Sequence, residues 1–375
     1  MDAMQAIAEG RFEDARALLS RLAAQEPEHA GAWLDLAILQ CGLGHATEAE
    51  ALFAVIELRF APSAAIREVI AQQRASGCRP QQQPGSYQLR VGRGYDDNAN
   101  QGARDLNLLI GDGAGGTVLA LTPEYAPRGD AYLNLQAEGR VPLANNGMVG
   151  FGQVLVRRYD HLDPYNLSAL SGGLEKPLSW GHWDARLAAS VGLVGLGGRL
   201  YQTHAQWHVQ LTPPLALPAG WRFALAAGQS LFEYRGQRVF DAWQTDGRAV
   251  LSYRYEGTML QLASGPLLET GREQRPGGDR KGWSYSAGGR TPLWGKVQAE
   301  WQWSRFDWHG SRAYLPGLID MRREQETEQL RLVLSYPVAR QQAVVAEFRQ
   351  VDHRENISIF SYRARQFSLN WQWQY

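Results

Sequence analysis

The side chains of this chain with most capacity for chemistry alternate with apolar residues along extended segments. His204 and His208 share one strand face with Gln202, Gln206 and Gln210. Two histidines on one face could ligate a metal or act as acid and base, but no Ser or Asp constellation accompanies either one. The favoured interpretation is a hydrated wall. We therefore predict no catalytic, cofactor-binding or metal site, and no enzyme activity.

Further charged side chains occupy the same polar phase of other segments. Arginines in that phase either stiffen a wall by pairing with Glu300 and Glu347, or attract an anionic substrate; wall stiffening is the favoured interpretation. The residues predicted to face a lumen and line a substrate path are Arg140, Arg186, His204, His208, Arg222, Arg248, Arg254, Arg290, Glu300, Arg331, Glu347 and Arg349.

A second candidate is the Asx-rich stretch of residues 94–102. Asp96, Asn98 and Asn100 have the first spacings of a calcium loop, but Gln101 replaces the glycine that such a loop needs. The plainer interpretation is a turn that leads from a linker into the first barrel strand, or a stretch folded inside the lumen. The residues of this pre-barrel motif are Tyr95, Asp96, Asp97, Asn98 and Asn100.

Strands must position these residues, and the last ten residues show the pattern most clearly. An apolar phase alternates with a polar phase of Gln, Ser and Asn, so the two faces of this strand meet different surroundings. An outward Arg or Lys near a bilayer midplane would cost about 2–4 kcal/mol, and the apolar phase of the clearest strands carries no charge. A soluble β-sandwich is the alternative to a lipid-facing barrel. The apolar phase comprises Phe367, Leu369, Trp371, Trp373 and Tyr375.

Turn signals divide the strands into two kinds of connection. Six short turns, several beginning with Pro-Leu and the sixth near residues 256–258, alternate with seven longer polar loops. Short periplasmic turns and longer extracellular loops are typical of outer-membrane barrels, so the pattern predicts about fourteen strands with both ends periplasmic. In one loop, Trp308, Tyr314 and Leu318 either fold inward as a constriction or contact a surface substrate. The longer loops are expected around residues 127–130, 160–165, 195–200, 235–241, 269–281, 307–325 and 352–364.

The N-terminal part has helical rather than strand periodicity, and four helices are expected in residues 2–77. A repeat of 34 positions, the tetratricopeptide period, relates its two halves, and Pro27 and Pro62 close them. The functional interpretation is a groove that holds a peptide or docks a partner; the alternative is a short scaffold or cap. The matched pairs are Gly10 and Gly44, Ala15 and Ala49, Leu18 and Leu52, Leu19 and Phe53, and Leu22 and Ile56.

Two cysteines, Cys41 and Cys78, exclude a disulfide-rich scaffold; a buried free thiol is favoured over a pair. Residues 1–8 have no secretory-signal pattern, so we interpret the sequence as mature or trimmed. A polar Pro-containing stretch, residues 79–86, is the expected domain boundary.

The whole pattern predicts an α+β multidomain chain, a short tetratricopeptide-like unit followed by a transmembrane antiparallel β-barrel. Aromatic residues and glycines are abundant, as in barrels with aromatic girdles and tight turns, and the zero net charge gives no nucleic-acid footprint. No apolar run reaches the roughly 18 residues of a membrane helix. The expected boundaries are 1–78 for the periplasmic helical domain, 79–116 for a linker and lumenal segment, and 117–375 for the barrel.

Tetratricopeptide units, the Gly-Tyr-Asp-Asp-Asn-Ala-Asn segment of residues 94–100 and about fourteen strands together resemble the surface lipoprotein assembly modifier family of type XI secretion. The resemblance implies an outer-membrane translocon whose periplasmic repeats engage a secreted protein or lipoprotein cargo. Further expected partners are outer-membrane lipid and the barrel assembly machinery, through residues 367–375. An exopolysaccharide export porin with a repeat scaffold is the alternative, and a structural or receptor barrel is a third class.

Overall fold

The structure is a computed structural model that describes residues 12–75, 77–78, 85–110, 117–144, 147–180 and 183–375, together with Ala3 and Ile7. The chain separates into a helical unit within Met1–Pro84 and a barrel unit formed by Gly85–Leu143 and Gly147–Tyr375. Most of the linker predicted at residues 79–86 lies outside the described residues, and Ser86 already belongs to a strand.

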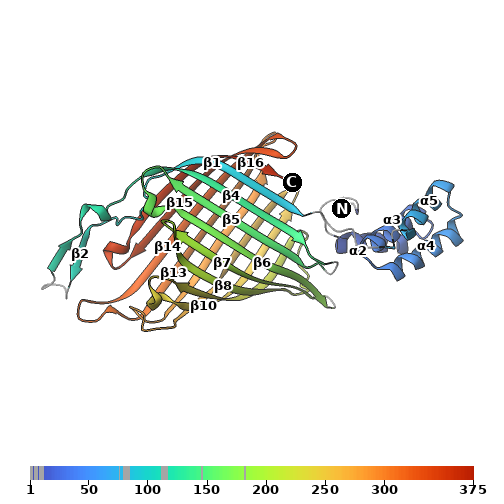
Figure 1. Ribbon diagram of the computed structural model, residues 1–375. Coiled ribbons are helices and arrows are strands. Elements are labelled where there is room, and N and C mark those ends of the chain that lie inside the picture. The colour runs from blue at the N-terminus through green and yellow to red at the C-terminus, as the bar shows by residue number, and fades with distance from the viewer. Residues whose placement is uncertain are drawn as a thin grey trace. The chain divides into compact units, whose positions relative to one another are not determined.

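The helical unit confirms the prediction of helices before the barrel (Figure 1). Ala3 and Ile7 are also helical. In the described part of the chain, no helix combines the length and apolar character that crossing a membrane requires, a finding that does not bear on strands. The four helices are α2 (Phe12–Gln25), α3 (Ala30–Gly42), α4 (Ala46–Phe60) and α5 (Ala64–Ala75).

The residues of the 34-position repeat form the core of this unit. Ala15 on α2 and Ala49 on α4 are both fully buried, and their small side chains allow neighbouring helices to approach closely. Phe53 and Ile56 are 0% and 1% exposed. Gly44, with φ +83°, makes the turn between α3 and α4 in a conformation that disfavours other residues.

The two cysteines form a disulfide, so the favoured prediction of free buried thiols is wrong. Cys41 on α3 and Cys78 beyond α5 have Cα atoms 4.4 Å apart, within the range that a disulfide spans. Cys41 packs in the same buried cluster as Ala37, Phe53 and Ile70. The bond ties the segment after α5 to this core, a long-range contact that periodicity within one helix does not reveal.

Among the described residues, fourteen strands form a closed antiparallel barrel, which confirms the predicted fold class and strand number. Each strand pairs with its neighbours in the chain, and the tilt of the strands is visible in Figure 1. The strands are β1 (Ser86–Asp96), β4 (Asp130–Pro142), β5 (Val149–Tyr159), β6 (Leu167–Trp180), β7 (Trp183–Leu196), β8 (Arg199–Thr212), β9 (Trp221–Tyr234), β10 (Ala242–Tyr255), β11 (Thr258–Gly271), β12 (Arg280–Pro292), β13 (Gln298–Leu315), β14 (Ile319–Ala339), β15 (Gln342–Glu355) and β16 (Tyr362–Gln374).

The barrel begins at Ser86, so the predicted boundary at residue 117 is wrong. Strand β1 closes the barrel: Val91 pairs with Trp371 of β16 and with Leu135 of β4. Arg93 interrupts the outward apolar phase of β1, and Gly92 and Gly94 leave its inner phase without polar side chains, so the alternation is concealed. A Cβ at Gly92 would overlap the Leu369 carbonyl oxygen, so close strand packing requires the glycine.

Residues 117–120 are strand β3 (Thr117–Ala120), which pairs with β2 (Asn107–Ile110) in a separate two-stranded sheet. This hairpin belongs to the long connection from β1 to β4 and projects past the end of the barrel in Figure 1. The predicted strand number is therefore correct because two errors cancel. The prediction omitted β1, and it placed a barrel strand between residues 117 and 127, a segment that the structure describes and in which it has none.

Connections alternate between the two ends of the barrel. We call the end where β1 begins and β16 stops the turn rim, and the opposite end the loop rim. The turn at residues 256–257 lies where it was predicted, with Glu256 and Gly257 at φ +44° and +81°. Two predicted long loops are wrong: residues 197–198 and 316–318 are short turns because their strands continue further, β13 and β14 for 18 and 21 residues.

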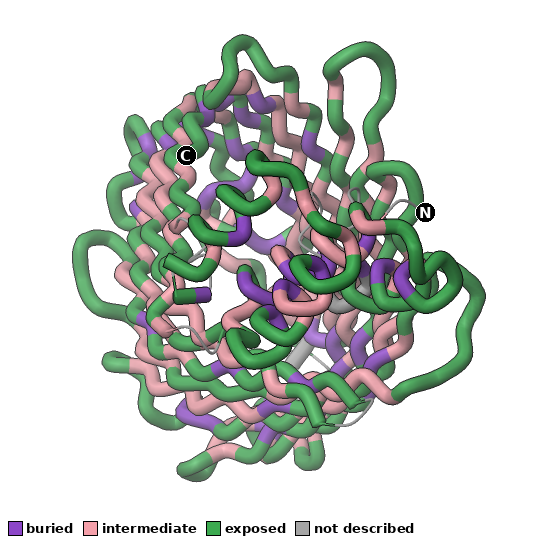
Figure 2. Tube along the Cα trace, turned by 90° about the vertical axis from the view of Figure 1, so that its right-hand side faces the viewer, coloured by how far each residue is buried: buried purple, intermediate pink, exposed green. Residues whose placement is uncertain are grey.

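The outer face of the wall is an apolar band between two sets of aromatic residues. Aliphatic side chains such as Val191 and Leu369 are 65% and 54% exposed in the middle of strands, and Figure 2 shows exposed residues alternating with less exposed ones along the wall. Such a band with aromatic girdles is the outer surface of a transmembrane barrel. Exposed aromatics near the turn rim include Tyr87, Trp180, Trp183, Trp221, Tyr255, Trp294, Tyr336, Trp373 and Tyr375, and those toward the loop rim include Tyr95, Tyr201, Trp243 and Trp283.

Candidate functional site

The strand register assigns each side chain to the lipid face or the lumen, because directly paired residues share a face. On β16, Phe367 and Leu369 are exposed outward, whereas Ser368 and Asn370 are 6% and 3% exposed on the inner face. Following the pairs around the barrel places every residue of the predicted lumen-facing set on the inner face. The structure does not bring the set together at one point, however, and its members fall into separate groups.

One group lines a cavity of about 480 Å³ inside the barrel near the turn rim. Arg290, Glu300 and Arg331 of the predicted set line it together with Arg90 and Glu138, which sequence analysis did not select. The lining also contains six glutamines, Gln88, Gln136, Gln153, Gln298, Gln372 and Gln374.

Arg331 is the organising cation of this cavity wall. Its guanidinium donates to Glu347 on β15 and to Glu300 on β13, each at 2.8 Å. Arg90 on β1 donates to the amide oxygen of Gln372 at 2.6 Å. Ion pairing of this kind fixes arginine side chains against the wall, the arrangement expected of wall stiffening.

A second group surrounds Glu175 on β6, an acid that sequence analysis missed. Arg140 on β4 and Arg186 on β7 lie 3.1 and 3.3 Å from the carboxylate of Glu175. Glu175 follows residues 172–173, a Gly-Gly pair, so the alternation of its strand is weak and gave no signal.

The remaining predicted lumen residues are distributed along the wall. Arg248 pairs with Asp246 at 2.9 Å, Arg254 donates to the sulfur of Met259, and Arg349 donates to Gln329. The ring centroids of His204 and Phe232 are 6.3 Å apart. His208 lies opposite Gly228, and Arg222 opposite Ser252, on neighbouring strands. In the described part of the chain, no group of three or more His, Cys, Asp or Glu side chains could hold a metal ion.

At the loop rim, acidic and basic side chains fill part of the lumen. Glu269 on β11 accepts hydrogen bonds from Arg280 on β12 and from Arg275 in the following loop. The Arg275 side chain is 9% exposed, and burial, together with the nearby Arg280 and Arg323 charges, lowers the pKa of Arg275 to about 10. It therefore remains a cation at neutral pH. The Arg275 side chain of this loop is thus directed toward Glu269, whereas residues 272–274 are exposed.

The loop candidates Trp308 and Tyr314 belong to the same filled region, but they lie on strand β13 and not in a loop. Trp308 is 9% exposed and stacks beneath the Arg280 guanidinium at 4.8 Å. Tyr314 packs against Phe360 and beneath Arg323, which pairs with the fully buried Glu355. Leu318, in contrast, is 47% exposed in the turn between β13 and β14. We call the inward set Glu269, Arg275, Arg280, Trp308, Arg323 and Glu355 the mouth cluster.

The Asx-rich motif ends strand β1, so its predicted place before the first barrel strand is wrong. Its side chains serve as hydrogen-bonding groups for the backbone. Asn98 donates to the carbonyls of Gly102 and Arg363, and its side-chain oxygen accepts from the Gly102 N–H at 2.7 Å. Asn100 accepts from the Arg128 N–H, and Asp97 from the Arg365 N–H. The motif thus fastens the β1–β4 connection to strand β16.

Asp96 of this motif points into the barrel, whereas Tyr95 is 54% exposed outward. The Asp96 carboxylate is 2% exposed and accepts from the Tyr159 hydroxyl at 2.9 Å and from Gln366 at 2.7 Å. Both neighbours donate hydrogen bonds to Asp96, so this carboxylate belongs to the hydrogen-bond network of the barrel wall.

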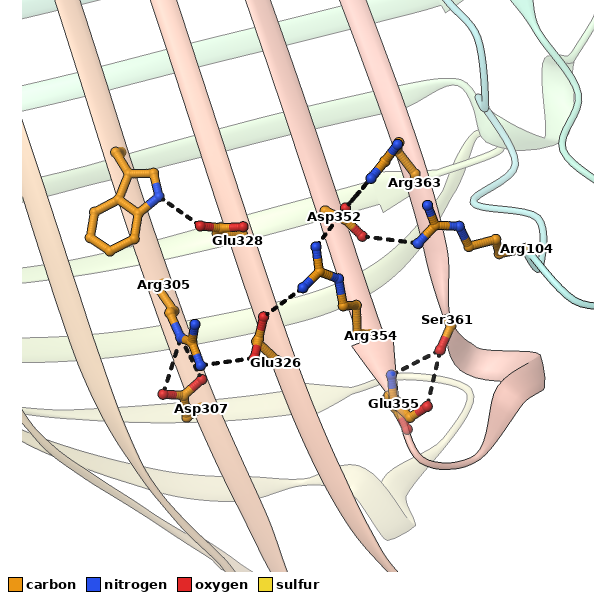
Figure 3. A network of polar contacts seen from close by, with 11 residues as sticks. Arg104, Arg305, Asp307, Glu326, Glu328, Asp352, Arg354, Glu355, Ser361 and Arg363 are labelled. Atoms are coloured by element: carbon orange, nitrogen blue, oxygen red, sulfur yellow. Dashed lines mark hydrogen bonds and ion pairs between the residues drawn. The ribbon is translucent and has the colours of Figure 1, made fainter.

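A further polar network lies on the outer face of β13–β16, toward the loop rim (Figure 3). Arg354 lies between Glu326 at 3.2 Å and Asp352 at 3.3 Å, and Arg104 approaches Asp352 from the β1–β4 connection. Trp303, in the aromatic girdle, donates to Glu328. These charges face outward beyond the apolar band and are largely paired with one another.

The comparisons with known proteins describe the two units separately. Residues 6–72 match the model of the tetratricopeptide repeat family. The search of curated proteins gives no match.

Solved structures similar to the barrel are outer-membrane proteins. An anion-selective porin from Comamonas acidovorans is 10% identical, with 78% of this chain and 98% of that chain covered and a TM-score of 0.38. A Pseudomonas aeruginosa FadL homologue is 10% identical, with 78% of this chain and 90% of that chain covered and a TM-score of 0.41. The outer-membrane channel DcaP of Acinetobacter baumannii is 8% identical, with 78% of this chain and 98% of that chain covered and a TM-score of 0.39. Similarity this low adds nothing to the barrel assignment, which stands on the strand register.

Proposed function

We propose that this protein is an outer-membrane translocon-like protein that helps export or display a protein or lipoprotein cargo. In this proposal the tetratricopeptide unit engages cargo in the periplasm and the barrel provides the route to the surface. The observation that carries it is the combination in one chain of a peptide-binding type of repeat with a barrel whose inner wall is polar and whose outer wall is apolar. The proposed role is not enzymatic.

The proposed orientation rests on chain continuity. Strand β1 begins at the turn rim, so the chain runs from the helical unit into that rim, and strand β16 ends there as well. Periplasmic turns of outer-membrane barrels are the shorter ones. The Cys41–Cys78 disulfide supports an oxidising compartment such as the periplasm for the helical unit. We therefore assign the turn rim to the periplasm and the loop rim to the cell surface.

The proposed path follows the inner wall from the glutamine-lined cavity toward the mouth cluster. Passage of cargo would require the mouth cluster to rearrange, because Glu269 and Arg275 are both nearly buried there. The sequence has no nucleotide-binding motif, so the energy for transport would come from cargo folding, binding or another machine. Lipid at the aromatic girdles and the barrel assembly machinery at residues 367–375 complete the proposed partners.

The test compares the surface proteins of cells with and without this gene, by labelling intact cells with a membrane-impermeant reagent. We expect one or a few proteins or lipoproteins to disappear from the labelled fraction and to accumulate inside the outer membrane. A plasmid copy of the gene should restore them. An unchanged protein surface would contradict the proposal, and loss of an extracellular polysaccharide instead would favour the exopolysaccharide porin.

A further inference from the structure

The cavity near the turn rim has an unusual lining for a binding site. Four of its six glutamines flank the closing strand β1: Gln136 and Gln153 come from β4 and β5, and Gln372 and Gln374 from β16. The other two are Gln88 on β1 itself and Gln298 on β13. Ligand pockets for small molecules are mostly apolar, with a few placed polar groups. In this cavity, polar side chains predominate and apolar ones are few. Its chemistry suits a ligand held by many weak polar contacts.

Three of these amides have free hydrogen-bonding groups. Within the described chain, the side chains of Gln88, Gln136 and Gln153 have no hydrogen-bond partner. Each primary amide offers a donor pair and an acceptor. A peptide group presents the complementary acceptor and donor, and an extended chain repeats them along both edges, independent of its sequence.

The charges around the cavity are mixed, which removes a strong preference for either sign. Arg90, Arg290 and Arg331 line the cavity together with Glu138 and Glu300. Arg331 is also neutralised by Glu347 at 2.8 Å. Because no single-sign field forms, both acidic and basic segments of a passing chain could be accommodated.

The lining also disfavours sugars. In the described cavity wall, no Trp, Tyr, Phe or His side chain is present. Pyranose rings have apolar faces that bind best against aromatic planes, and the aromatic residues of this barrel lie mainly outside, in the girdles. The amide groups alone would bind hydroxyls, but they would not supply the flat apolar contact.

We propose that this glutamine-lined cavity is a sequence-tolerant binding site for an extended polypeptide segment. The inference rests on the proposed function and makes it more specific: the cargo would occupy the periplasmic end of the barrel as an unfolded segment, not as a folded domain. A cavity of about 480 Å³ holds only a short stretch of chain, consistent with threading and not with storage of a whole protein.

The test uses the full-length protein in detergent and a fluorescent, unstructured peptide of glycine, serine and threonine with no net charge. A photo-crosslinking residue is introduced as Gln153→p-benzoylphenylalanine. The matched control carries the same residue at Gln206, which faces the lumen on β8 but does not line the cavity. We expect roughly tenfold more crosslinking at position 153 than at 206, the ratio that corresponds to about 1.4 kcal/mol.

Variants separate the amide groups from the shape of the cavity. Gln88→Leu with Gln136→Leu should reduce crosslinking at position 153 severalfold, whereas Gln88→Asn with Gln136→Asn should retain most of it. Equal crosslinking at 153 and 206 would overturn the inference, as would competition by a neutral linear oligosaccharide but not by unlabelled peptide. Because binding is measured in detergent and export in cells, loss of one result does not imply loss of the other.

Discussion

The helical unit and the barrel place their apolar residues on opposite sides. In the helical unit, Phe53 and Ile56 are 0% and 1% exposed, as in any water-soluble core. In the barrel, Val191 and Phe367 are 65% and 56% exposed, whereas Asn370 is 3% exposed. Both arrangements remove apolar surface from water, one by packing side chains together and the other by presenting them to lipid. One chain is therefore built for two solvents.

The two units also differ in what holds them together. The helices depend on side-chain packing around the Ala15 and Ala49 contacts and on one disulfide. The barrel depends on a closed ladder of backbone hydrogen bonds that leaves no edge strand, with strand β1 completing the circle. Damage to one unit should therefore leave the other intact, and the predictions below test this independence.

The largest effect is expected from Phe53→Ala in the helical core. Removing a fully buried aromatic ring should lower the free energy of unfolding of this unit by about 3–5 kcal/mol. Circular dichroism in the helical bands should show the loss on heating. The gel mobility of the unboiled protein, which reports the folded barrel, should not change. Loss of the folded barrel together with the folded helical unit would contradict the independence of the two units.

On the barrel, Val191→Arg is expected to cost about 2–4 kcal/mol, because it places a cation against lipid near the middle of β7. Equilibrium unfolding in lipid vesicles measures the change. Gln206→Arg, on the neighbouring strand but facing the lumen, is the matched control and should have little effect. Equal costs at both positions would show that the two faces meet the same surroundings.

Removing the disulfide should affect the helical unit alone. Cys41 and Cys78 are separated by 37 residues, and closing a loop of this length stabilises by roughly 2–4 kcal/mol in the chain-entropy account. Thermal unfolding of the Cys41→Ser, Cys78→Ser double variant measures the loss, which the reduced native protein should reproduce. An unchanged unfolding temperature on reduction would contradict a stabilising role.

Within the barrel, Arg275→Ala should loosen the loop at residues 272–279. Loss of the Arg275 hydrogen bond to the buried Glu269 carboxylate is expected to cost about 1.5–3 kcal/mol, roughly a tenfold or larger rise in local opening. Proteolysis of intact protein at this loop reports the change. Arg272→Ala in the same loop removes only an exposed pair with Glu233 and is the control that should differ little from the native protein.

The smallest effect concerns His161 at the loop rim. Its hydrogen bond with the Asp130 carboxylate raises the pKa of His161 above the ordinary value of 6.5. The stabilising contribution is present below the unfolded pKa and is lost as pH rises through the higher folded pKa. An NMR titration should show the raised value, and Asp130→Asn should return it toward 6.5; an ordinary pKa in the native protein would contradict the pairing.

Features that recur along the sequence could be predicted from it, whereas features that depend on long-range contacts could not. The 34-residue offset located the helical core, and the period of two located the faces of most strands. Strand β1 was not predicted because Arg93 breaks its outward apolar phase, and because Gly92 and Gly94, required by close approach to β16, leave its inner phase without polar side chains. The Cys41–Cys78 bond was not predicted because it depends on a long-range contact, and helical periodicity does not show which elements meet.

The sequence predicted which residues of the candidate site face the lumen, but not which of them lie close together. Alternation identified Arg290, Glu300 and Arg331 as one kind of residue, yet only the barrel register brings them beside Arg90 and Gln372. The glutamines gave no signal, because isolated neutral side chains on a polar phase resemble ordinary wall positions. Inward folding of Trp308 was one of the two predicted alternatives, but its charged partners in the mouth cluster were not predicted, because residues 307–325 were interpreted as a loop although most of them continue strands β13 and β14.

The most direct test of the two-solvent account is a spin-label scan along strand β8 in lipid vesicles, with single cysteines introduced at positions 204–209. Collision rates with oxygen, which concentrates in lipid, and with a water-soluble nickel complex are measured at each position. We predict a period of two: labels at Ala205, Trp207 and Val209 favour oxygen, and labels at His204, Gln206 and His208 favour nickel. The same ratio of the two rates at all six positions would contradict the assignment of lipid and water to opposite faces of the wall.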